Sequence, residues 1–454
     1  MAGELFATNT RPAVPPVSGG GKLTLFLLAL VIVVIAEAIG NVSIPVGAGK
    51  IVLLPLLWAL LLGGALGLMS PRLPEPLRLS GALQNAAGAY LQPALLIFIA
   101  KLGLLVGGSL PKILASGWAL AFQEFGHFFG TMVFGLPVAL LLGIKREAIG
   151  ATFSVGREPS LAIIGERYGM DSPEGRGVLA EYLTGTVFGA VFIALLAGLI
   201  TSLGIFNPLA LAMGAGVGSG SMMAAASGAI AAQQTPEVAK DVATFAAASN
   251  LVTTTIGTYF TLFLSLPFTI WAYGKLEPIL GRNRPDAARP AAAEPQGAAP
   301  AHQEVRIGLG ETVLAWILIG AYGLIGNWLT YGIVPDASVV AGMAIIIGTV
   351  LAGWGLYLLL GRRLPAVLWV SIIGMALTYP GTPYAAEIAA LTGKLNFLAL
   401  ATPILTFAGL SVAKDVPAFR RLGWRIVVVS FMANAGTFLG AALIAQFFMH
   451  APLG

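Results

Sequence analysis

Apolar residues fall in long continuous blocks along the chain, and short stretches rich in Gly, Pro or charge separate these blocks. Many blocks reach about 20 residues, enough for a helix to cross the roughly 30 Å hydrocarbon core of a bilayer. They lack the two-residue alternation of a transmembrane β-barrel. The pattern predicts an all-α, polytopic transmembrane helical bundle of about 13 segments: 24–45, 51–70, 84–107, 114–142, 148–164, 177–203, 207–232, 240–272, 310–332, 338–360, 364–378, 390–412 and 418–448.

Polar stretches divide the chain into two unequal membrane halves. A polar N-terminal tail, residues 1–22, precedes membrane half one, residues 23–275. Residues 276–308 are rich in Ala, Pro and charge and lack an apolar period. This composition predicts a flexible linker before membrane half two, residues 309–454.

The composition excludes an ordinary soluble protein. Of the 454 residues 57% are hydrophobic and 10% are charged, whereas a soluble domain carries about 25% charged residues. Cysteine is absent, so disulfides and thiolate sites are excluded. The three histidines are widely separated in the sequence, and we therefore expect no metal site and no cofactor.

The net charge of +5 comes from basic loops and does not indicate nucleic-acid binding. If the N-terminus is cytoplasmic, the loops that contain Lys145 with Arg146 and Arg362 with Arg363 all lie inside. Cytoplasmic loops of membrane proteins carry an excess of Lys and Arg. The sequence therefore predicts a multi-pass protein with its N-terminus in the cytoplasm.

An internal duplication relates the two halves. Nine residues recur 306 positions later, without a gap, in a comparison of 29 positions. The duplication indicates that parts of the two halves fold alike. The matching residues are Gly103, Leu104, Val106, Pro111, Gly117, Trp118, Phe125, Gly130 and Thr131, which recur as Gly409, Leu410, Val412, Pro417, Gly423, Trp424, Phe431, Gly436 and Thr437.

The direction of the equivalent segments bears on whether this repeat is inverted. In the predicted topology, segments 84–107 and 390–412 run in opposite directions, as an inverted repeat requires. The first segments of the two halves, however, run in the same direction. The conflict leaves open whether segments 148–164 and 364–378, which are short and interrupted, span the bilayer fully.

Segment 148–164 contains a break in its helix. Arg157 and Glu158 at bilayer depth cost a few kcal/mol each unless they face protein or a water-filled cavity. A half-helix that begins after the break would direct free N–H groups at an anion. The alternative is a structural Arg157–Glu158 pair in a re-entrant turn or a cytoplasmic loop. The predicted substrate-binding residues here are Ser154, Gly156, Arg157, Glu158 and Ser160.

A second break lies in segment 207–232, where Gly and Ser alternate. Such small residues leave backbone amides and carbonyls open to a ligand, and the alternative is close helix packing. We expect Gly218, Ser219, Gly220 and Ser221 to bind substrate. Because both breaks lie in the same half, we expect them to form one site.

Hydroxyl and amide side chains line one face of segment 240–272. Asn250, Thr254, Thr258 and Thr261 follow helical spacing on this face. Asn250 and Thr254 are predicted to contact the substrate, since such groups can coordinate sodium or hydrogen-bond a carboxylate. Hydrogen bonding between helices is the alternative.

Glu124 and His127 lie one turn apart in the middle of segment 114–142. Both side chains can gain or lose a proton in a buried site. They are therefore the candidate proton-coupling residues, together with Glu158. A structural Glu–His pair without a transport role is the alternative.

Two stretches carry a resemblance to a known family. The first joins Gly156–Ser160 to residues 164–178, which read Ile-Gly-Glu-Arg-Tyr-Gly-Met-Asp-Ser-Pro-Glu-Gly-Arg-Gly-Val, and the second is Gly214–Gly228. Together they resemble a bacterial inner-membrane family catalogued as a domain of unknown function, number 3100. The resemblance implies a location in the bacterial inner (plasma) membrane.

The Gly-Ser-Met-Met-Ala-Ala run is also similar to small-residue breaks in the cation:proton antiporter and anion transporter superfamily. Its members use inverted repeats, broken helices and an elevator-like movement. This similarity implies a core domain, residues 148–275, that moves against a scaffold containing segments 51–70 and 338–360. About 13 segments do not fit a simple five-plus-five repeat, which weakens the elevator prediction.

These features predict a secondary active transporter of the elevator type and not an enzyme. The expected substrate is a small organic anion or an amino acid, and the expected coupling ion is H⁺ or Na⁺. The other expected partners are the lipid bilayer and a second copy in a homodimer. A cation:proton antiporter is the alternative, although the segments lack an Asp pair. A pore or a membrane enzyme is a third alternative, and the sequence has no His-Glu-x-x-His motif to favour an enzyme.

Overall fold

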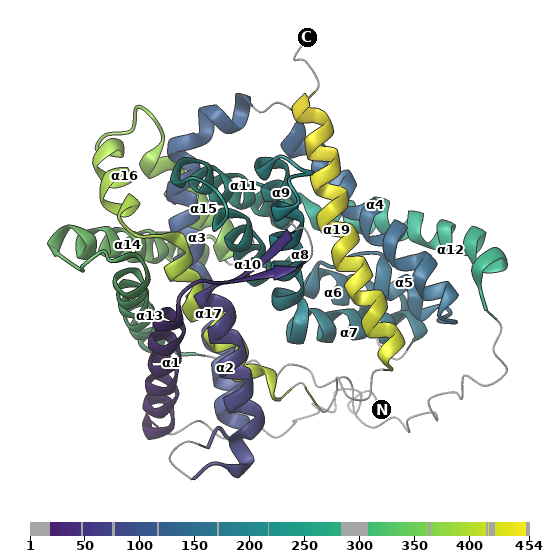
Figure 1. Ribbon diagram of the computed structural model, residues 1–454, viewed down its shortest axis with the longest axis horizontal. Helices are drawn as coiled ribbons and strands as arrows, with labels where there is room; N and C mark the ends of the chain where they lie inside the picture. Colours follow the sequence, from purple (N-terminus) through teal and green to yellow (C-terminus); the bar gives the residue numbers. More distant parts are fainter. Residues whose placement is uncertain are drawn as a thin grey trace, which may run out of the picture.

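The structure is a computed structural model, and it is almost entirely helical (Figure 1). Most of the tail and of the linker lies outside the described residues. The first helix begins at Gly19, inside the predicted tail, and another helix continues to Leu280, inside the predicted linker. The described residues are 19–46, 49–74, 78–115, 118–169, 172–216, 218–282, 307–361, 365–414, 416 and 423–450.

The chain builds three successive groups of elements. The first is α1 (Gly19–Ile39), β1 (Val42–Val46), β2 (Gly49–Leu53), α2 (Pro55–Met69), the 3₁₀ turn η1 (Ser70–Arg72), α3 (Gly81–Ala115) and α4 (Ala119–Leu141). The second is α5 (Glu147–Thr152), α6 (Arg157–Tyr168), α7 (Pro173–Thr184), the π-helix η3 (Gly185–Gly189), α8 (Ala190–Ser202), α9 (Pro208–Ala215), α10 (Gly220–Ala231), α11 (Pro236–Phe260), the π-helix η4 (Thr261–Ser265) and α12 (Leu266–Leu280). The third is α13 (Leu309–Tyr331), α14 (Ala337–Leu359), α15 (Ala366–Thr378), α16 (Ala385–Gly393), α17 (Phe397–Val412) and α19 (Trp424–His450).

Seven helical stretches among the described residues are long and apolar enough to cross a membrane. An eighth is obtained if α16 and α17, which meet at a bend of 60°, count as one span. The expectation of about 13 segments is not confirmed, because several of them form short or broken helices. Segment 148–164 is divided into α5 and α6, and segment 207–232 is divided into α9 and α10, so both predicted breaks are present.

Large apolar side chains cover much of the outer surface. Such exposure is unfavourable in water and is the expected surface of a protein surrounded by lipid. Together with the long apolar helices it is consistent with a membrane protein. The exposed side chains include Leu23, Val31, Phe263, Trp271, Leu443 and Phe447.

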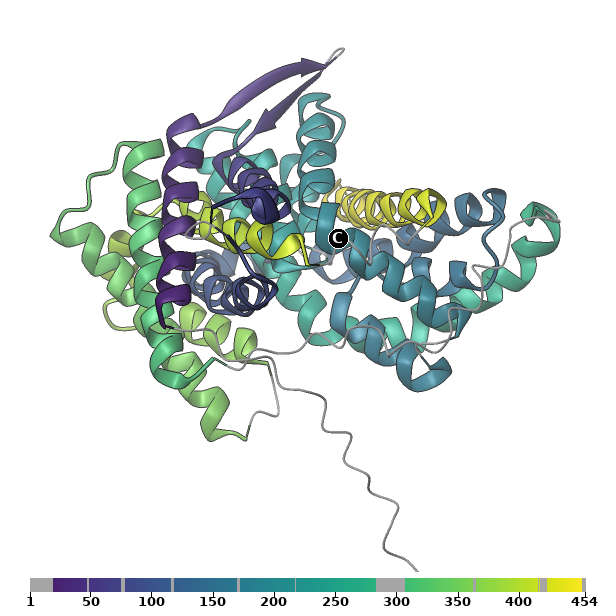
Figure 2. The same ribbon diagram turned by 90° about the horizontal axis from the view of Figure 1, so that it is seen from below.

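The helices form two groups along the long axis of the molecule (Figures 1 and 2). The first helix group is α1–α3 with α13–α17, and the second helix group is α4–α12 with α19. The groups meet where α3 packs against α11 and where α10 packs against α17. The short antiparallel hairpin β1–β2 also contacts α8 across this boundary.

Glycine allows very close packing between α4 and α19. A Cβ atom added at Gly130 would overlap the carbonyl oxygen of Gly436, and one at Gly126 would overlap that of Gly440. Since residue numbers rise along α4 as they fall along α19, the two helices are antiparallel. The hydroxyls of Thr131 and Thr437 also hydrogen-bond across this contact. One of these close backbone approaches therefore joins Gly130 to its counterpart in the predicted repeat.

Two further close contacts resemble each other. In one, Gly409 of α17 packs against the carbonyl oxygen of Leu60 in α2. In the other, Gly103 of α3 packs against the backbone of Ser371 in α15. Gly103 and Gly409 are again 306 residues apart. The contact of α2 with α17 thus has a counterpart in the contact of α15 with α3.

Ion pairs connect the loop after α4 with the ends of helices α5, α7 and α12. Lys145 Nζ lies 2.8 Å from Glu277 Oε1, and Arg176 Nη2 lies 2.9 Å from Glu147 Oε1. Arg146 pairs with the buried carboxylate of Glu174. The hydrogen bond to Glu174 raises the pKa of the Arg146 guanidinium above its usual value, so this guanidinium stays charged at physiological pH.

Candidate functional site

Three polar side chains lie together in the interior of α4. Gln123, Glu124 and His127 are only 0%, 1% and 2% exposed, although α4 is apolar enough to cross a membrane. Ionisable groups inside a membrane helix are costly and are usually retained for a function. These residues therefore form the first part of the candidate site.

The Glu124 carboxylate has hydrogen-bond donors on one oxygen only. Gln123 Nε2 donates to Glu124 Oε1 at 2.7 Å, and the Thr253 hydroxyl of α11 donates to the same oxygen. Glu124 Oε2 lies 3.5 Å from His127 Nδ1. Neither Glu124 Oε2 nor either ring nitrogen of His127 has a hydrogen-bond partner among the described residues. This geometry suits a proton that moves between a carboxylate and an imidazole.

Helix α11 also holds the break between α9 and α10. Asn250 Nδ2 donates to the carbonyl oxygen of Gly216 at 2.8 Å and to that of Gly218 at 3.4 Å. The Ser249 hydroxyl donates to the carbonyl oxygen of Met213 at 2.7 Å. Gly218 has φ +93°, a backbone conformation that residues other than glycine rarely adopt. The break is therefore fixed by side chains of one neighbouring helix.

Asn250 and Thr253 connect the acidic cluster to this break. They lie three residues apart on α11, so they share one face of the helix. Asn250 binds the break, and Thr253 binds Glu124. We call Gln123, Glu124, His127, Asn250 and Thr253 the α4–α11 site. Asn250 was among the residues predicted from the sequence, and Thr253 was not. The i, i+3 spacing of Thr253 from Asn250 could have identified it.

The predicted residue Thr254 lies elsewhere. Its side chain is exposed, and its hydroxyl donates to the carbonyl oxygen of Asn250 in its own helix at 2.8 Å. Ser219 and Ser221 lie beside the break, with their hydroxyls 3.2 Å apart. Ser219 also caps α10 by accepting a hydrogen bond from the backbone N–H of Met222. Thus Ser219 and Ser221 lie beside the break that Asn250 binds, whereas the Thr254 hydroxyl is exposed and bonds within α11.

The first break, between α5 and α6, is held by η4, the π-helix that follows α11. The Ser265 hydroxyl of η4 donates to the carbonyl oxygen of Phe153. Ser154 is buried and accepts a hydrogen bond from the N–H of Gly156 at 3.0 Å. Ser160 is buried, and its hydroxyl has no partner among the described residues. Arg157 and Glu158 begin α6, but their side chains, and with them the predicted anion contact, lie outside the described part of the structure.

The two breaks do not form one site, contrary to the prediction. They are held by Asn250 and Ser265, which lie 15 residues apart in the continuous stretch α11–η4. At 1.5 Å per residue this spacing is about 22 Å. Adjacency in the sequence was misleading because the intervening helices α7 and α8 carry the chain to another level of the bundle.

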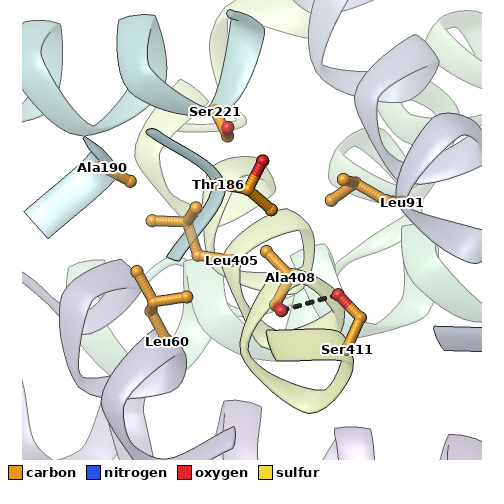
Figure 3. A pocket seen from close by; sticks show the side chains of 8 residues that line it. All are labelled: Leu60, Leu91, Thr186, Ala190, Ser221, Leu405, Ala408 and Ser411. Atoms are coloured by element: carbon orange, nitrogen blue, oxygen red, sulfur yellow. Dashed lines mark hydrogen bonds between the residues drawn. The ribbon is translucent and has the colours of Figure 1, made fainter. Parts of the chain in front are cut away.

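A small cavity lies where the two helix groups meet (Figure 3). Its volume of about 30 Å³ is enough for a water molecule and is far below the roughly 300 Å³ of a typical ligand pocket. An organic anion would therefore need a more open conformation to enter. The lining residues are Leu60, Leu91, Thr186, Ala190, Ser221, Leu405, Ala408 and Ser411.

A known protein family covers the part of the chain that contains the α4–α11 site. A family model described as a protein of unknown function, DUF3100, matches residues 34–275, more than half of the chain. The chain belongs to this family. The DUF3100 region extends from α1 to α12 and contains both breaks and the whole α4–α11 site. No curated protein and no solved structure matches the chain.

Replacing Asn250 with leucine tests its role in holding the break. We expect Asn250→Leu to lower the free energy of unfolding by about 1–3 kcal/mol, because buried carbonyl groups lose their donor. Hydrogen–deuterium exchange should become faster in residues 213–221. Thr254→Val is the matched control, since it removes an exposed hydroxyl that bonds only within α11. Equal exchange in both variants would contradict this role.

Proposed function

We propose that this DUF3100 protein is a secondary active transporter of a small organic anion or an amino acid, coupled to H⁺ or Na⁺. The observation that carries the proposal is the buried Glu124–His127 pair, which α11 links to a break whose backbone carbonyls accept hydrogen bonds from Asn250 and Ser249. A proton on this pair would change the charge next to the break, and this couples ion binding to a solute site. In this proposal Glu124 and His127 exchange the coupling proton.

The antiparallel contact of α4 with α19 supports an inverted repeat. Equivalent helices of an inverted repeat run in opposite directions through the bilayer. Gly130 and Gly436 are equivalent by sequence and meet in an antiparallel crossing. The inversion remains part of the proposal.

The two helix groups support an alternating-access movement. The second helix group carries the α4–α11 site, and both helix groups line the small cavity, which Ser221 borders next to the break between α9 and α10. In an elevator-type movement, the second group would slide against the first and carry the site between the two faces. The predicted core, residues 148–275, would then also include α4 and α19, which pack closely on α5, α7, α9 and α11.

A ligand screen followed by transport assays tests the proposal. Purified protein is heated with carboxylates, amino acids and sodium or potassium salts at two pH values. A ligand at 100 times its Kd raises the free energy of unfolding by about 2.7 kcal/mol. Each stabilising solute is then tested in proteoliposomes for counterflow and for uptake driven by a proton or sodium gradient. Absence of counterflow for every carboxylate and amino acid would overturn the proposal.

A cation:proton antiporter is the second candidate. The α4–α11 site offers carboxylate, amide and hydroxyl oxygens, which are ligands that suit hard cations. An antiporter would release protons when sodium or potassium is added to weakly buffered protein. Proton release with salt, together with no response to organic acids, would favour this function over the first.

Cross-linking tests the movement, and the absence of cysteine makes the chain well suited to it. Ser221→Cys with Ser411→Cys places one thiol on each helix group, on two sides of the cavity. We expect a short bis-thiosulfonate linker on this pair to stop counterflow. The control pair, Thr131→Cys with Thr437→Cys, lies within the second helix group and should leave counterflow unchanged. Full counterflow with the linked cavity pair would contradict the movement.

A further inference from the structure

A second buried glutamate lies between α7 and α19, and the proposed function does not use it. Glu181 is only 2% exposed. Asn434 Nδ2 donates to Glu181 Oε1 at 3.3 Å and to the carbonyl oxygen of Ser430 at 2.8 Å. Glu181, Ser430 and Asn434 therefore form a polar cluster inside the bundle, which we call the α7–α19 cluster.

Two oxygen atoms of this cluster are unused. Asn434 Oδ1 and Ser430 Oγ are buried and have no hydrogen-bond partner among the described residues. An unsatisfied buried polar group costs about 1–3 kcal/mol. A cation or a water bound beside the carboxylate would satisfy both oxygens and offset this cost. The cluster therefore has the character of a ligand site.

Helices α4 and α19, which we call the outer helices, relate this cluster to the α4–α11 site. Because Gly130 and Gly436 meet in an antiparallel crossing, a half-turn about their contact exchanges α4 with α19. The same operation pairs Glu124 with Ser430, which is 306 residues later. Each site thus includes the same repeat position, which is Glu124 in α4 and Ser430 in α19.

Helices α5–α12, which we call the inner helices, contain a second duplication. The same half-turn relates its two copies. The order of a short helix, a 12-residue helix and a long helix with a π-helix occurs as α5, α6, α7–η3–α8 and again as α9, α10, α11–η4–α12. Ser172-Pro173-Glu174 begins α7, and Thr235-Pro236-Glu237 begins α11 63 residues later. Helix α7 is therefore the counterpart of α11.

The packing of the inner helices agrees with this exchange. Helices α5 and α7 both contact α19, and their counterparts α9 and α11 both contact α4. The contact between α7 and α19 is thus equivalent to the contact between α11 and α4. Both contacts contain one buried glutamate. It comes from α4 in the α4–α11 site and from α7 in the α7–α19 cluster.

We infer that Glu181, Ser430 and Asn434 form a second ion site, which binds a monovalent cation of the sodium type. The inference rests on the proposed function only in assigning this ion a role in coupling. Carboxylate, amide and hydroxyl oxygens are hard ligands that suit such a cation. The described cluster contains a single carboxylate, whereas Ca²⁺ takes about six to eight oxygens and commonly several carboxylates.

Direct binding of radioactive sodium to the purified protein tests the inference without any transport assay. Glu181→Gln removes the charge and keeps the shape, and Ser430→Ala removes one unused oxygen. Because Ser430 Oγ has no partner in the part of the chain that the structure describes, alanine removes no hydrogen bond seen there, and this variant is expected to fold. We expect Ser430→Ala to weaken sodium binding about tenfold, the loss of roughly 1.4 kcal/mol of binding free energy. Glu181→Gln should remove binding to this site.

Controls separate this inference from the proposed function. Thr349→Val removes a buried hydroxyl in α14 that bonds within its own helix, and sodium binding should remain at the wild-type level. Glu124→Gln should leave sodium binding to the α7–α19 cluster intact. Unchanged binding in both Glu181→Gln and Ser430→Ala, or a wild-type protein that binds no sodium, would overturn the inference. If sodium binds as expected but no solute is transported, the ion site stands and the proposed function fails.

Discussion

Glu124→Gln is expected to abolish proton-driven uptake in proteoliposomes while the protein remains folded. Glutamine has nearly the same shape and can still accept the hydrogen bonds from Gln123 and Thr253. It cannot release or bind the coupling proton, so a proton gradient would no longer drive net movement of the solute. Uptake driven by the gradient should fall to the level of empty liposomes. Counterflow, which needs no net proton movement, should persist.

The matched control for this prediction is Glu277→Gln. This change also removes one carboxylate charge, but Glu277 pairs with Lys145 near the end of α12 and is partly exposed. Ion pairs of this kind contribute about 0–1 kcal/mol, so the variant should retain driven uptake. Gradient-driven uptake by Glu124→Gln at the wild-type rate would exclude Glu124 as the proton carrier. His127→Gln would then show whether the imidazole acts alone.

Gly130→Ala should prevent normal folding or reduce stability strongly. The new methyl group would overlap the carbonyl oxygen of Gly436, and backbone atoms on both sides leave no flexible side chain to move aside. Overpacking of this kind costs about 1–3 kcal/mol and occasionally more. We expect a lower unfolding temperature in detergent and a smaller yield of monodisperse protein. Gly440→Ala should act similarly, since its methyl group would overlap the carbonyl oxygen of Gly126.

Gly348→Ala is the control for these two substitutions. No atom lies within 4 Å of a Cβ at Gly348, in the middle of α14. Alanine is favoured over glycine in a helix by about 0.5–1 kcal/mol, so this variant should be as stable as the wild type or more stable. If Gly130→Ala and Gly348→Ala unfold at the same temperature, the close crossing of α4 and α19 is wrong.

The sequence predicted the helices and their breaks because both depend on local properties. Apolar blocks about 20 residues long indicate membrane helices, and Gly and Pro interrupt them at Gly156 and Gly218. The predicted number of about 13 segments is not confirmed, because an apolar block of similar length can be one helix or two short ones. The strands β1 and β2 were missed since their apolar residues merge with the neighbouring blocks.

The candidate site was predicted only in part, for a physical reason. The Glu124–His127 pair follows from spacing within one helix, which a sequence displays directly. The contact of Thr253 with Glu124 joins positions 129 residues apart and depends on how α11 packs against α4. Likewise, nothing in the local pattern places Asn434 beside Glu181, 253 residues away. Such contacts become visible only when the helices are assembled.

The glycine crossing of α4 and α19 has a use in measurement. Backbone rests on backbone there, so the two helices cannot slide without a collision of carbonyl groups. A pair of spin labels on the outer faces of α4 and α19 should therefore report one unchanging distance in every state of the protein. That distance would serve as an internal ruler, against which label pairs between the two helix groups could be calibrated.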